Sequence, residues 1–443
     1  MAEGAGVETE TETTSADEVA DLPPRPLWRN RDYLILWVGG AISTLGAQAS
    51  ALALPLLILA TTGSPAQAGL VGALRGLPYV LFGLPAGGLV DRWDRKRVMV
   101  LCDAGRALAL ASIPLALALG RLTAVQLYAV TFVDGTLFIF FGRAETPALR
   151  RVVSTAQLPA ALAQGQATSA AAGLVGPALG GALFGLGRAL PFLVDAASYA
   201  ASAAALLCVR GRFQEERGAD RGALRAAIGA GLRWLWAEPV VRRLLWVADG
   251  VNLLYGGWAL LLIALARRLG APDAAIGLIF AGGGAGTILG ALLAPRAQRR
   301  FTVGQLMVGL AWLFALTWPL YALAPTPLAL GLVNALVFSF VPIFNGTQFG
   351  YRLLLVPDAL QGRVNSVFRL VTFGGQTLGL LLMGALLEWR GPVATVWILS
   401  GPQVALALLT MLSGPLRRAG RLAATSNGPH SARHRRPHDA PTD

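Results

Sequence analysis

The stretch Gly87–Arg97, GGLVDRWDRKR, separates two long apolar segments by a short run of charged residues. Residues 66–90 before it contain a single charged residue, Arg75, and a second apolar run opens at Val98. A membrane-spanning helix needs roughly 20 apolar residues. The stretch therefore predicts a tight polar hinge between two membrane helices. Because basic residues in short loops resist translocation, we expect the hinge on the cytoplasmic side.

The composition points to the same class of protein. Of the 443 residues, 55% are hydrophobic and 14% are charged, whereas a soluble domain carries about 25% charged residues. Segments of about 10 alternating residues, typical of outer-membrane barrels, are absent. The net charge of +13 falls in the loops, so we expect it to set topology rather than bind nucleic acid. Lys96, the only lysine, precedes Arg97 and not Ser or Thr, which excludes an ATP-binding P-loop.

We predict an all-α polytopic protein of a bacterial inner (plasma) membrane with twelve crossings and both termini in the cytoplasm, because the even-numbered connections are the more basic ones. The expected spans are Tyr33–Ala60, Ala66–Val90, Val98–Leu119, Leu122–Phe141, Leu162–Leu186, Leu190–Val209, Leu244–Ala266, Ala274–Ala294, Val303–Leu323, Leu328–Gly350, Val364–Leu387 and Val393–Leu412.

The chain divides into two six-helix halves between two tails. We expect a disordered acidic tail over residues 1–24, a first half over 25–210, a cytoplasmic linker with an amphipathic helix over 211–243, a second half over 244–414 and a disordered basic tail over 415–443. Asp91-Arg92-x-x-Arg95-Lys96 is echoed 204 residues later at Pro295, and Gly176–Leu183 is echoed 203 residues later at Gly379. Two echoes at nearly one offset predict parallel repeats.

With these features the chain resembles the major facilitator superfamily. The hinge is similar to that family's loop signature at Gly87, Asp91, Arg92, Arg95 and Lys96, with Asp94 in place of the usual second glycine. The resemblance implies that this loop packs against the opposite half and holds one end-state of the transport cycle, with Asp91 as a latch.

A second motif, Gly176-Pro177-x-x-Gly180-Gly181 in the fifth span, is similar to the antiporter motif of drug exporters. Proline bends a helix and glycines allow close helix approach. Longer stretches, among them FLVDAASYAASA and VPDALQGRVNSVFRL, resemble the branch with macrolide-efflux and enterobactin-exporter proteins. The Arg-x-x-Gln-Gly signature of many proton-coupled exporters is absent between Leu122 and Arg151.

Charged residues inside the spans are candidate coupling sites, because burying them in lipid costs roughly 2.5 to 3.5 kcal/mol each. Arg75 and Asp134 lie at similar depth, so an ion pair between them is geometrically possible. It is either a structural bridge or a proton site. We expect a structural pair between Asp103 and Arg106. Asp195 and Asp249 are expected as helix-end anchors, with gating as their alternative role.

Polar side chains in the seventh, tenth and eleventh spans are the candidate substrate contacts, with interhelical hydrogen bonding as the alternative role. They are Asn252, Tyr255, Asn334, Asn345, Gln348 and Gln376. Trp258 and Phe344 are candidates for an apolar cavity wall. All three histidines lie in the C-terminal tail, and we expect no metal or cofactor.

Together these patterns predict a monomeric secondary transporter, not an enzyme, that exports a hydrophobic or amphipathic small molecule such as a drug, macrolide or siderophore by proton antiport. Its expected partners are the lipid bilayer, the substrate and protons. An uptake or uniport permease of the same fold is the first alternative, and a non-transporting membrane sensor or scaffold is the second. A membrane-embedded enzyme is disfavoured because the spans contain no histidine.

Overall fold

The computed structural model describes residues 26–83, 85–90, 92–209, 229 and 231–421, and the described regular structure is helical throughout. The first half contains η2 (Leu27–Arg29), α1 (Arg31–Thr62), α2 (Pro65–Phe82), α3 (Pro85–Val90), α4 (Arg95–Ala118), α5 (Ala124–Val152), α6 (Leu158–Leu186) and α7 (Leu190–Cys208). The second contains α9 (Pro239–Tyr255), α10 (Trp258–Arg268), α11 (Asp273–Arg300), α12 (Val303–Thr317), α13 (Leu320–Leu323), α14 (Pro327–Leu355), α15 (Asp358–Leu412) and α16 (Gly414–Arg417).

The described helices confirm an all-α polytopic membrane fold. Ten helical segments, of which one combines α9 with α10 and another combines α12 with α13, are long and apolar enough to cross a membrane. Helix α15 has 55 residues and would be about 80 Å long if straight, but Gly391 at φ 74° breaks it into two. The second predicted span is divided between α2 and the short α3. The number of twelve crossings stays a prediction, and residues 1–24, most of the linker and the tail beyond Arg421 lie outside the described residues.

Local sequence signals fix the helix ends. Helix α12 begins with a capping box, in which Thr302 and Gln305 each bond the other's backbone N–H. Helices α1 and α10 are followed by Gly63 and Gly270 at positive φ, a conformation that favours glycine. Polar caps and glycine stops thus allow short connections, so that neighbouring helices run antiparallel.

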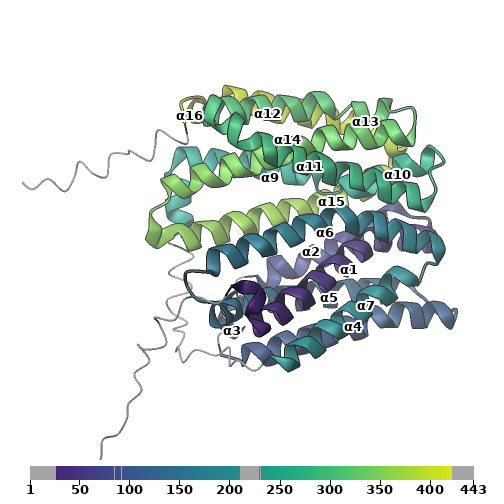
Figure 1. The fold of residues 1–443 in the computed structure, drawn as a ribbon. Coiled ribbons are helices and arrows are strands. Elements are labelled where there is room, and N and C mark those ends of the chain that lie inside the picture. The colour runs from purple at the N-terminus through teal and green to yellow at the C-terminus, as the bar shows by residue number, and fades with distance from the viewer. Residues whose placement is uncertain (1–25, 84, 91, 210–228, 230, 422–443) are drawn as a thin grey trace, which may run out of the picture.

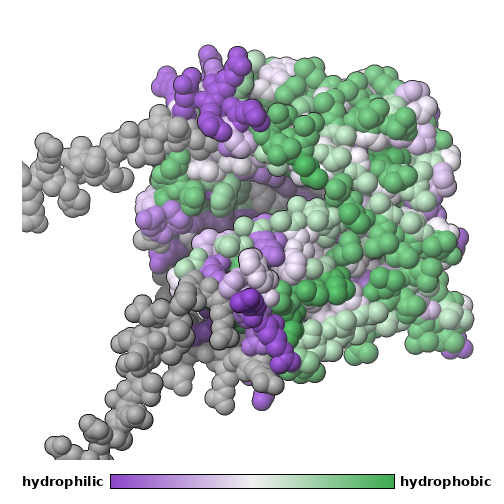
Figure 2. Space-filling view, viewed as in Figure 1, coloured by the Kyte–Doolittle hydropathy of each residue, from purple (hydrophilic) through white to green (hydrophobic). Residues whose placement is uncertain are grey.

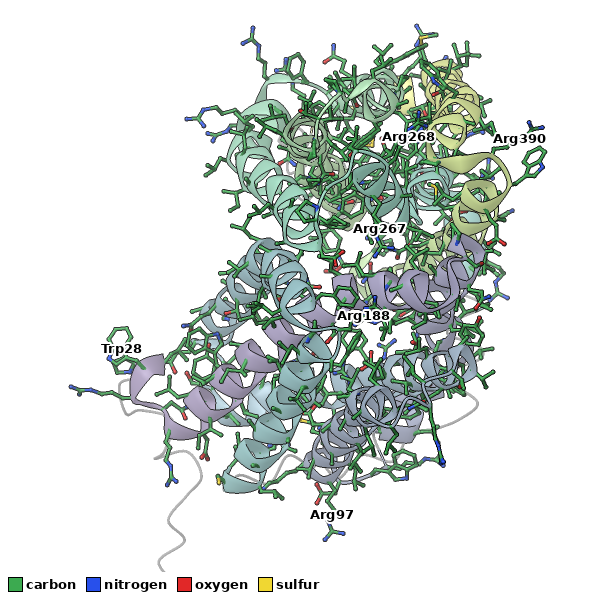
Figure 3. The ribbon with its side chains drawn as sticks, turned by 90° about the vertical axis from the view of Figure 1, so that its right-hand side faces the viewer. Trp28, Arg97, Arg188, Arg267, Arg268 and Arg390 are labelled. Atoms are coloured by element: carbon green, nitrogen blue, oxygen red, sulfur yellow. The ribbon has the colours of Figure 1, made fainter. Side chains whose placement is uncertain are left out.

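The two halves lie one above the other in Figure 1, with α1–α7 below and α9–α16 above. The described chain begins and ends at one end of the bundle, which we call the terminal end. The other is the opposite end. Hydrophilic residues gather at the terminal end, while apolar residues cover the side of the bundle (Figure 2). The opposite end faces the viewer in Figure 3. Arg188 lies there between α6 and α7, Arg267 and Arg268 in the last turn of α10, and Arg390 in α15 next to the break at Gly391.

Two helix pairs hold the halves together. Helix α2 packs on α15, and α6 packs on α11. A Cβ atom on Gly181 of α6 would lie 2.9 Å from the Cα of Gly277 on α11, so these backbones approach as closely as glycine permits. Glu388 of α15 accepts hydrogen bonds from the Ser64 hydroxyl and the Ala66 N–H at the start of α2. These contacts close the seam between the halves at the opposite end.

Candidate functional site

Asp134 of α5 is the centre of a buried charge cluster in the first half. Its Oδ1 accepts a hydrogen bond from Arg106 Nε of α4 at 2.8 Å, and its Oδ2 lies 3.5 Å from Arg75 Nε of α2. The ion pair considered possible from the sequence is therefore present. Asp134 and Arg75 each lie about 15 Å along their helices, which places them at similar depth. The Asp134 carboxylate therefore joins α2, α4 and α5. A change in its charge would alter the contacts of all three helices.

Arg106 is enclosed by aromatic rings as well as by Asp134. Its guanidinium carbon lies 3.9 Å from the ring centroid of Tyr199 on α7 and 5.5 Å from that of Phe138 on α5. Such cation–π contacts partly replace lost hydration. The sequence paired Arg106 with Asp103 and missed Asp134. Asp103 is 1% exposed, its Oδ2 has no hydrogen-bond partner among the described residues, and the ion pair found for Arg106 is with Asp134.

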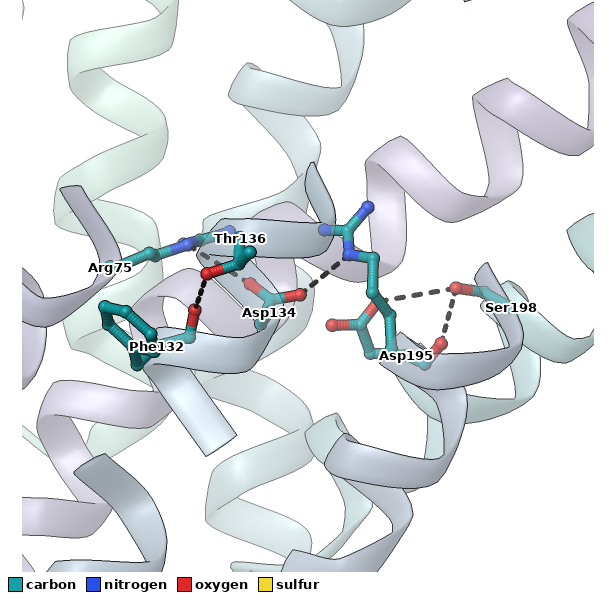
Figure 4. A network of polar contacts seen from close by, with 7 residues as sticks. Arg75, Phe132, Asp134, Thr136, Asp195 and Ser198 are labelled. Atoms are coloured by element: carbon teal, nitrogen blue, oxygen red, sulfur yellow. Dashed lines mark hydrogen bonds and ion pairs between the residues drawn. The ribbon is translucent and has the colours of Figure 1, made fainter. Parts of the chain in front are cut away.

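Asp195 of α7 completes the cluster (Figure 4). It is 2% exposed and accepts from the Ser198 hydroxyl. It also lines a small cavity together with Arg75, Asp134 and Ser50. It lies in the second turn of α7, near the helix end as expected, and α1 covers it, since a Cβ on Gly46 would lie 2.7 Å from its Oδ1. Asp249 does not lie at a helix end: it is about 15 Å along α9, where its Oδ1 is buried without a hydrogen-bond partner among the described residues.

A cavity of about 430 Å³ lies between the two halves, where Figure 2 shows the surface hollowed. Helices α1 and α6 form one wall, and α10, α11 and α14 form the other. No lining side chain is charged, and Gln48 and Thr287 are among the few polar ones. Ala51 of α1 lines both this cavity and the small cavity beside Asp134 and Asp195. The charge cluster and the apolar cavity are thus separated only by α1.

A second cavity, of about 310 Å³, lies within the second half. It brings together four of the six predicted substrate contacts, Asn252, Tyr255, Asn345 and Gln376, and the predicted wall residues Trp258 and Phe344. Trp258 also lines the cavity between the halves. The two cavities therefore share one aromatic wall.

The other two predicted contacts do not line either cavity. Asn334 is fully buried; it accepts from Trp258 Nε1 at 3.1 Å and Tyr321 OH at 3.0 Å, and donates to the Ile279 carbonyl at 3.0 Å. Gln348 donates to Asn345 Oδ1 at 3.3 Å. Asn334 thus has the alternative role, that of an interhelical hydrogen-bond centre.

Comparison of the chain with known proteins identifies its family. The sequence model of the family described as transmembrane secretion effector matches residues 24–434. The chain belongs to the major facilitator superfamily. It is 30% identical to the multidrug efflux pump Tap of Mycobacterium tuberculosis over 407 residues, which cover 88% of this chain and 94% of Tap.

Two further comparisons agree. The enterobactin exporter EntS of Citrobacter koseri is 27% identical over 379 residues, covering 83% of this chain and 88% of EntS. Among solved structures, that of a variant of the nucleoside transporter NupG aligns with a TM-score of 0.73 at 15% identity, covering 87% of this chain and 100% of NupG. At that identity the likeness shows the major facilitator fold alone.

The antiporter-like motif of this major facilitator protein lies at a helix crossing. A Cβ on Gly176 or Gly180 would lie 2.4 Å from atoms of Gln48 or Ala49 on α1. Gly181 faces α11 of the other half, and the Pro177 carbonyl lies 2.7 Å from where a Cβ on Gly277 would be. The motif therefore allows α6 to touch α1 and α11 at once.

In the loop motif, the hydrogen bonds found for Asp94 and Lys96 lie within the first half. Asp94 is the N-cap of α4 and accepts from the Arg97 N–H at 3.1 Å, so the replacement of glycine by aspartate supplies a cap. Lys96 Nζ donates to the Leu207 and Val209 carbonyls at the end of α7, at 3.2 and 2.6 Å. Arg92 is exposed, Arg95 is buried, and Gly87 lies in α3. The predicted latch, Asp91, lies outside the described residues.

Proposed function

We propose that this major facilitator protein exports a hydrophobic or amphipathic small molecule in exchange for protons, by alternating access between its halves. The observation that carries the substrate class is the uncharged cavity of about 430 Å³ between the halves. Its size and apolar walls suit a drug-sized molecule, which a few polar groups would orient. The names of Tap and EntS, a multidrug efflux pump and an enterobactin exporter, support export.

The terminal end is proposed to face the cytoplasm. Basic residues of the described helix ends concentrate there, among them Arg95, Lys96, Arg97, Arg150, Arg151, Arg299 and Arg300, as the positive-inside rule requires. With the seam closed at the opposite end by Glu388 and by the contact of Gly181 with α11, the substrate cavity of this conformation would be reached from the cytoplasm. A substrate would then leave after the halves separate at the opposite end.

Coupling is proposed to run through Asp134. A proton on its carboxylate would remove the charge that holds Arg106 and Arg75. Arg75 belongs to α2, the helix that packs on α15 of the other half. Loss of that ion pair would release α2 from α5 and so favour rearrangement of the interface. Asp195, buried in the same cluster with the Ser198 hydroxyl as its partner, is proposed as a second carboxylate able to take a proton.

Drug-induced proton release from proteoliposomes tests the coupling. Asp134→Asn is expected to abolish release, and Asp273→Asn, an acid paired with Arg267 at the opposite end, is the control. Asp195→Asn shows whether a second carboxylate contributes. Unchanged release and efflux in Asp134→Asn would contradict the assignment. Transport in right-side-out and inverted vesicles separates export from uptake, because only inverted vesicles would accumulate the substrate of an exporter.

A further inference from the structure

Arg352 presents a buried positive charge outside both cavities. It lies in the last turn of α14 and is 8% exposed. Its Nη2 donates to Asn365 Oδ1 at 3.0 Å, and its guanidinium carbon lies 3.8 Å from the ring centroid of Phe368. Its Nη1 is buried and has no hydrogen-bond partner among the described residues. No ion pair found between described residues includes Arg352.

A nearby anion would stabilise the positive charge of Arg352, because burial cannot neutralise it. A buried lysine can lose its proton, but a guanidinium in a protein stays charged. An unpartnered buried charge is costly, and the C-terminal dipole of α14 and the Phe368 ring offset only part of that cost. The nearest acid along the hairpin between α14 and α15, Asp358, is exposed and accepts from Gln361 Nε2 at 2.9 Å.

Arg352 lines a pocket of about 230 Å³ between the end of α14 and the start of α15. The other lining residues are Phe349, Leu353, Val356, Gln361, Gly362, Val364 and Asn365. The lining residues that belong to α15 begin at Gln361, about one turn after the helix start at Asp358. The Arg352 guanidinium, whose Nη1 has no partner among the described residues, is thus the group that attracts an anion to this pocket.

The edge of the pocket faces the membrane. Phe349 is 51% exposed and Leu353 is 48% exposed, although both are large apolar residues on a helix of a membrane protein. Arg352 lies about 4.5 Å before the end of α14, near the level expected for lipid headgroups at the terminal end. An acyl chain could therefore cover Phe349 and Leu353 while its headgroup enters the pocket.

We propose that the Arg352 pocket is a binding site for a phosphate oxyanion, supplied either by a phospholipid headgroup or by soluble phosphate. The oxyanion accepts from the guanidinium of Arg352, which lines the pocket. It therefore lies between the end of α14 and the start of α15, at the terminal end. This site shares no lining residue with the cavity between the halves or with that of the second half, and it does not depend on the proposed export function.

The test uses the purified full-length protein in neutral detergent and two probes. Native mass spectrometry counts bound phosphatidylglycerol, and a melting curve against inorganic phosphate measures soluble anion binding. Arg352→Gln removes the guanidinium. Gly362→Leu keeps the guanidinium and adds a large apolar side chain to a residue that lines the pocket. Arg363→Gln is the control, because it removes an exposed charge near the same pocket without lining it.

We expect the wild type and Arg363→Gln to bind alike, and both pocket variants to bind at least tenfold more weakly. Binding of phosphatidylglycerol alone identifies the lipid as the source, and stabilisation by inorganic phosphate identifies a soluble anion. If Arg352→Gln does not fold, Gly362→Leu decides. The proposal is overturned if the wild type binds neither probe, or if Gly362→Leu binds both as well as the wild type does.

Discussion

Gly69 of α2 and Gly384 of α15 meet across the two halves near the opposite end. A Cβ on Gly69 would lie 3.0 Å from the Cα of Gly384 and 2.6 Å from the Leu380 carbonyl oxygen. Any side chain at position 69 must therefore push α2 away from α15. The conformation that closes the opposite end depends on this contact more directly than on any contact inside one half.

Gly69→Leu should shift the protein toward the conformation open at the opposite end. Overpacking a close contact costs about 1 to 3 kcal/mol, and this cost falls only on the closed conformation. Spin labels at positions 188 and 268 should report a longer distance, and transport should fall. Gly309→Leu is the control, because nothing lies within 4 Å of a Cβ there. Equal distance distributions in both variants would show that the contact does not set the equilibrium.

Glu388→Gln should produce a weaker shift in the same direction. The carboxylate accepts two hydrogen bonds from the start of α2, and charge-assisted bonds are stronger than neutral ones. The amide retains one acceptor oxygen, so part of the contact survives. The same label pair measures the shift, with Glu238→Gln as the control because Glu238 is the first residue before α9, outside the seam. A shift larger than that of Gly69→Leu would contradict the prediction that the Gly69–Gly384 contact contributes more than the Glu388 hydrogen bonds.

Arg106→Gln should lower the amount of folded protein in the membrane. Removing one partner of a buried ion pair costs about 3 to 5 kcal/mol, because the remaining charge loses its compensation. Arg106 is the closer partner of Asp134 and is 4% exposed. The double variant Arg106→Gln with Asp134→Asn should recover folding, measured as monodisperse protein in size-exclusion chromatography, without recovering proton release. A double variant as unstable as the single one would assign the role of Arg106 to the Tyr199 contact instead.

Asn334→Leu and Asn252→Ala should separate stability from transport. The Asn334 side chain forms hydrogen bonds with the side chains of Trp258 and Tyr321 and with the Ile279 carbonyl. Each buried polar group left without a partner costs about 1 to 3 kcal/mol. Its replacement should lower the melting temperature clearly. Asn252 lines the cavity of the second half and donates within its own helix to the Ala248 carbonyl. Its replacement should change the KM for transport with little effect on melting.

The helical membrane fold and the Arg75–Asp134 pair could be predicted from apolar run lengths and from residue positions along the helices. Depth along a helix is proportional to residue number, so the Arg75–Asp134 pair could be predicted from helix starts alone. The partner of Arg106 could not, because the direction in which a side chain leaves the helix decides it. The spacing of three residues from Asp103 suggested a local pair, but the long arginine side chain reaches α5 instead.

The direction in which a side chain leaves its helix also explains why some of the predicted amide contacts line a cavity and others do not. Asn252 and Asn334 are equally polar in sequence, yet one lines a cavity and the other is buried among three partners. No pattern within a single helix distinguishes those two faces. The Asp94 cap, by contrast, had a readable signal: an aspartate directly before a helical segment whose third N–H it can accept.

Ion pairs are distributed unequally between the two repeats. Among the described residues, the pairs in the membrane interior, Asp134 with Arg75 and Arg106, belong to the first half. The second half contributes only Arg267 with Asp273, at the opposite end. A transmembrane voltage acts on charges and not on amides or aromatic rings. In the proposed transport cycle a proton on Asp134 changes the charge of the first-half cluster, so a transmembrane voltage would act on this step.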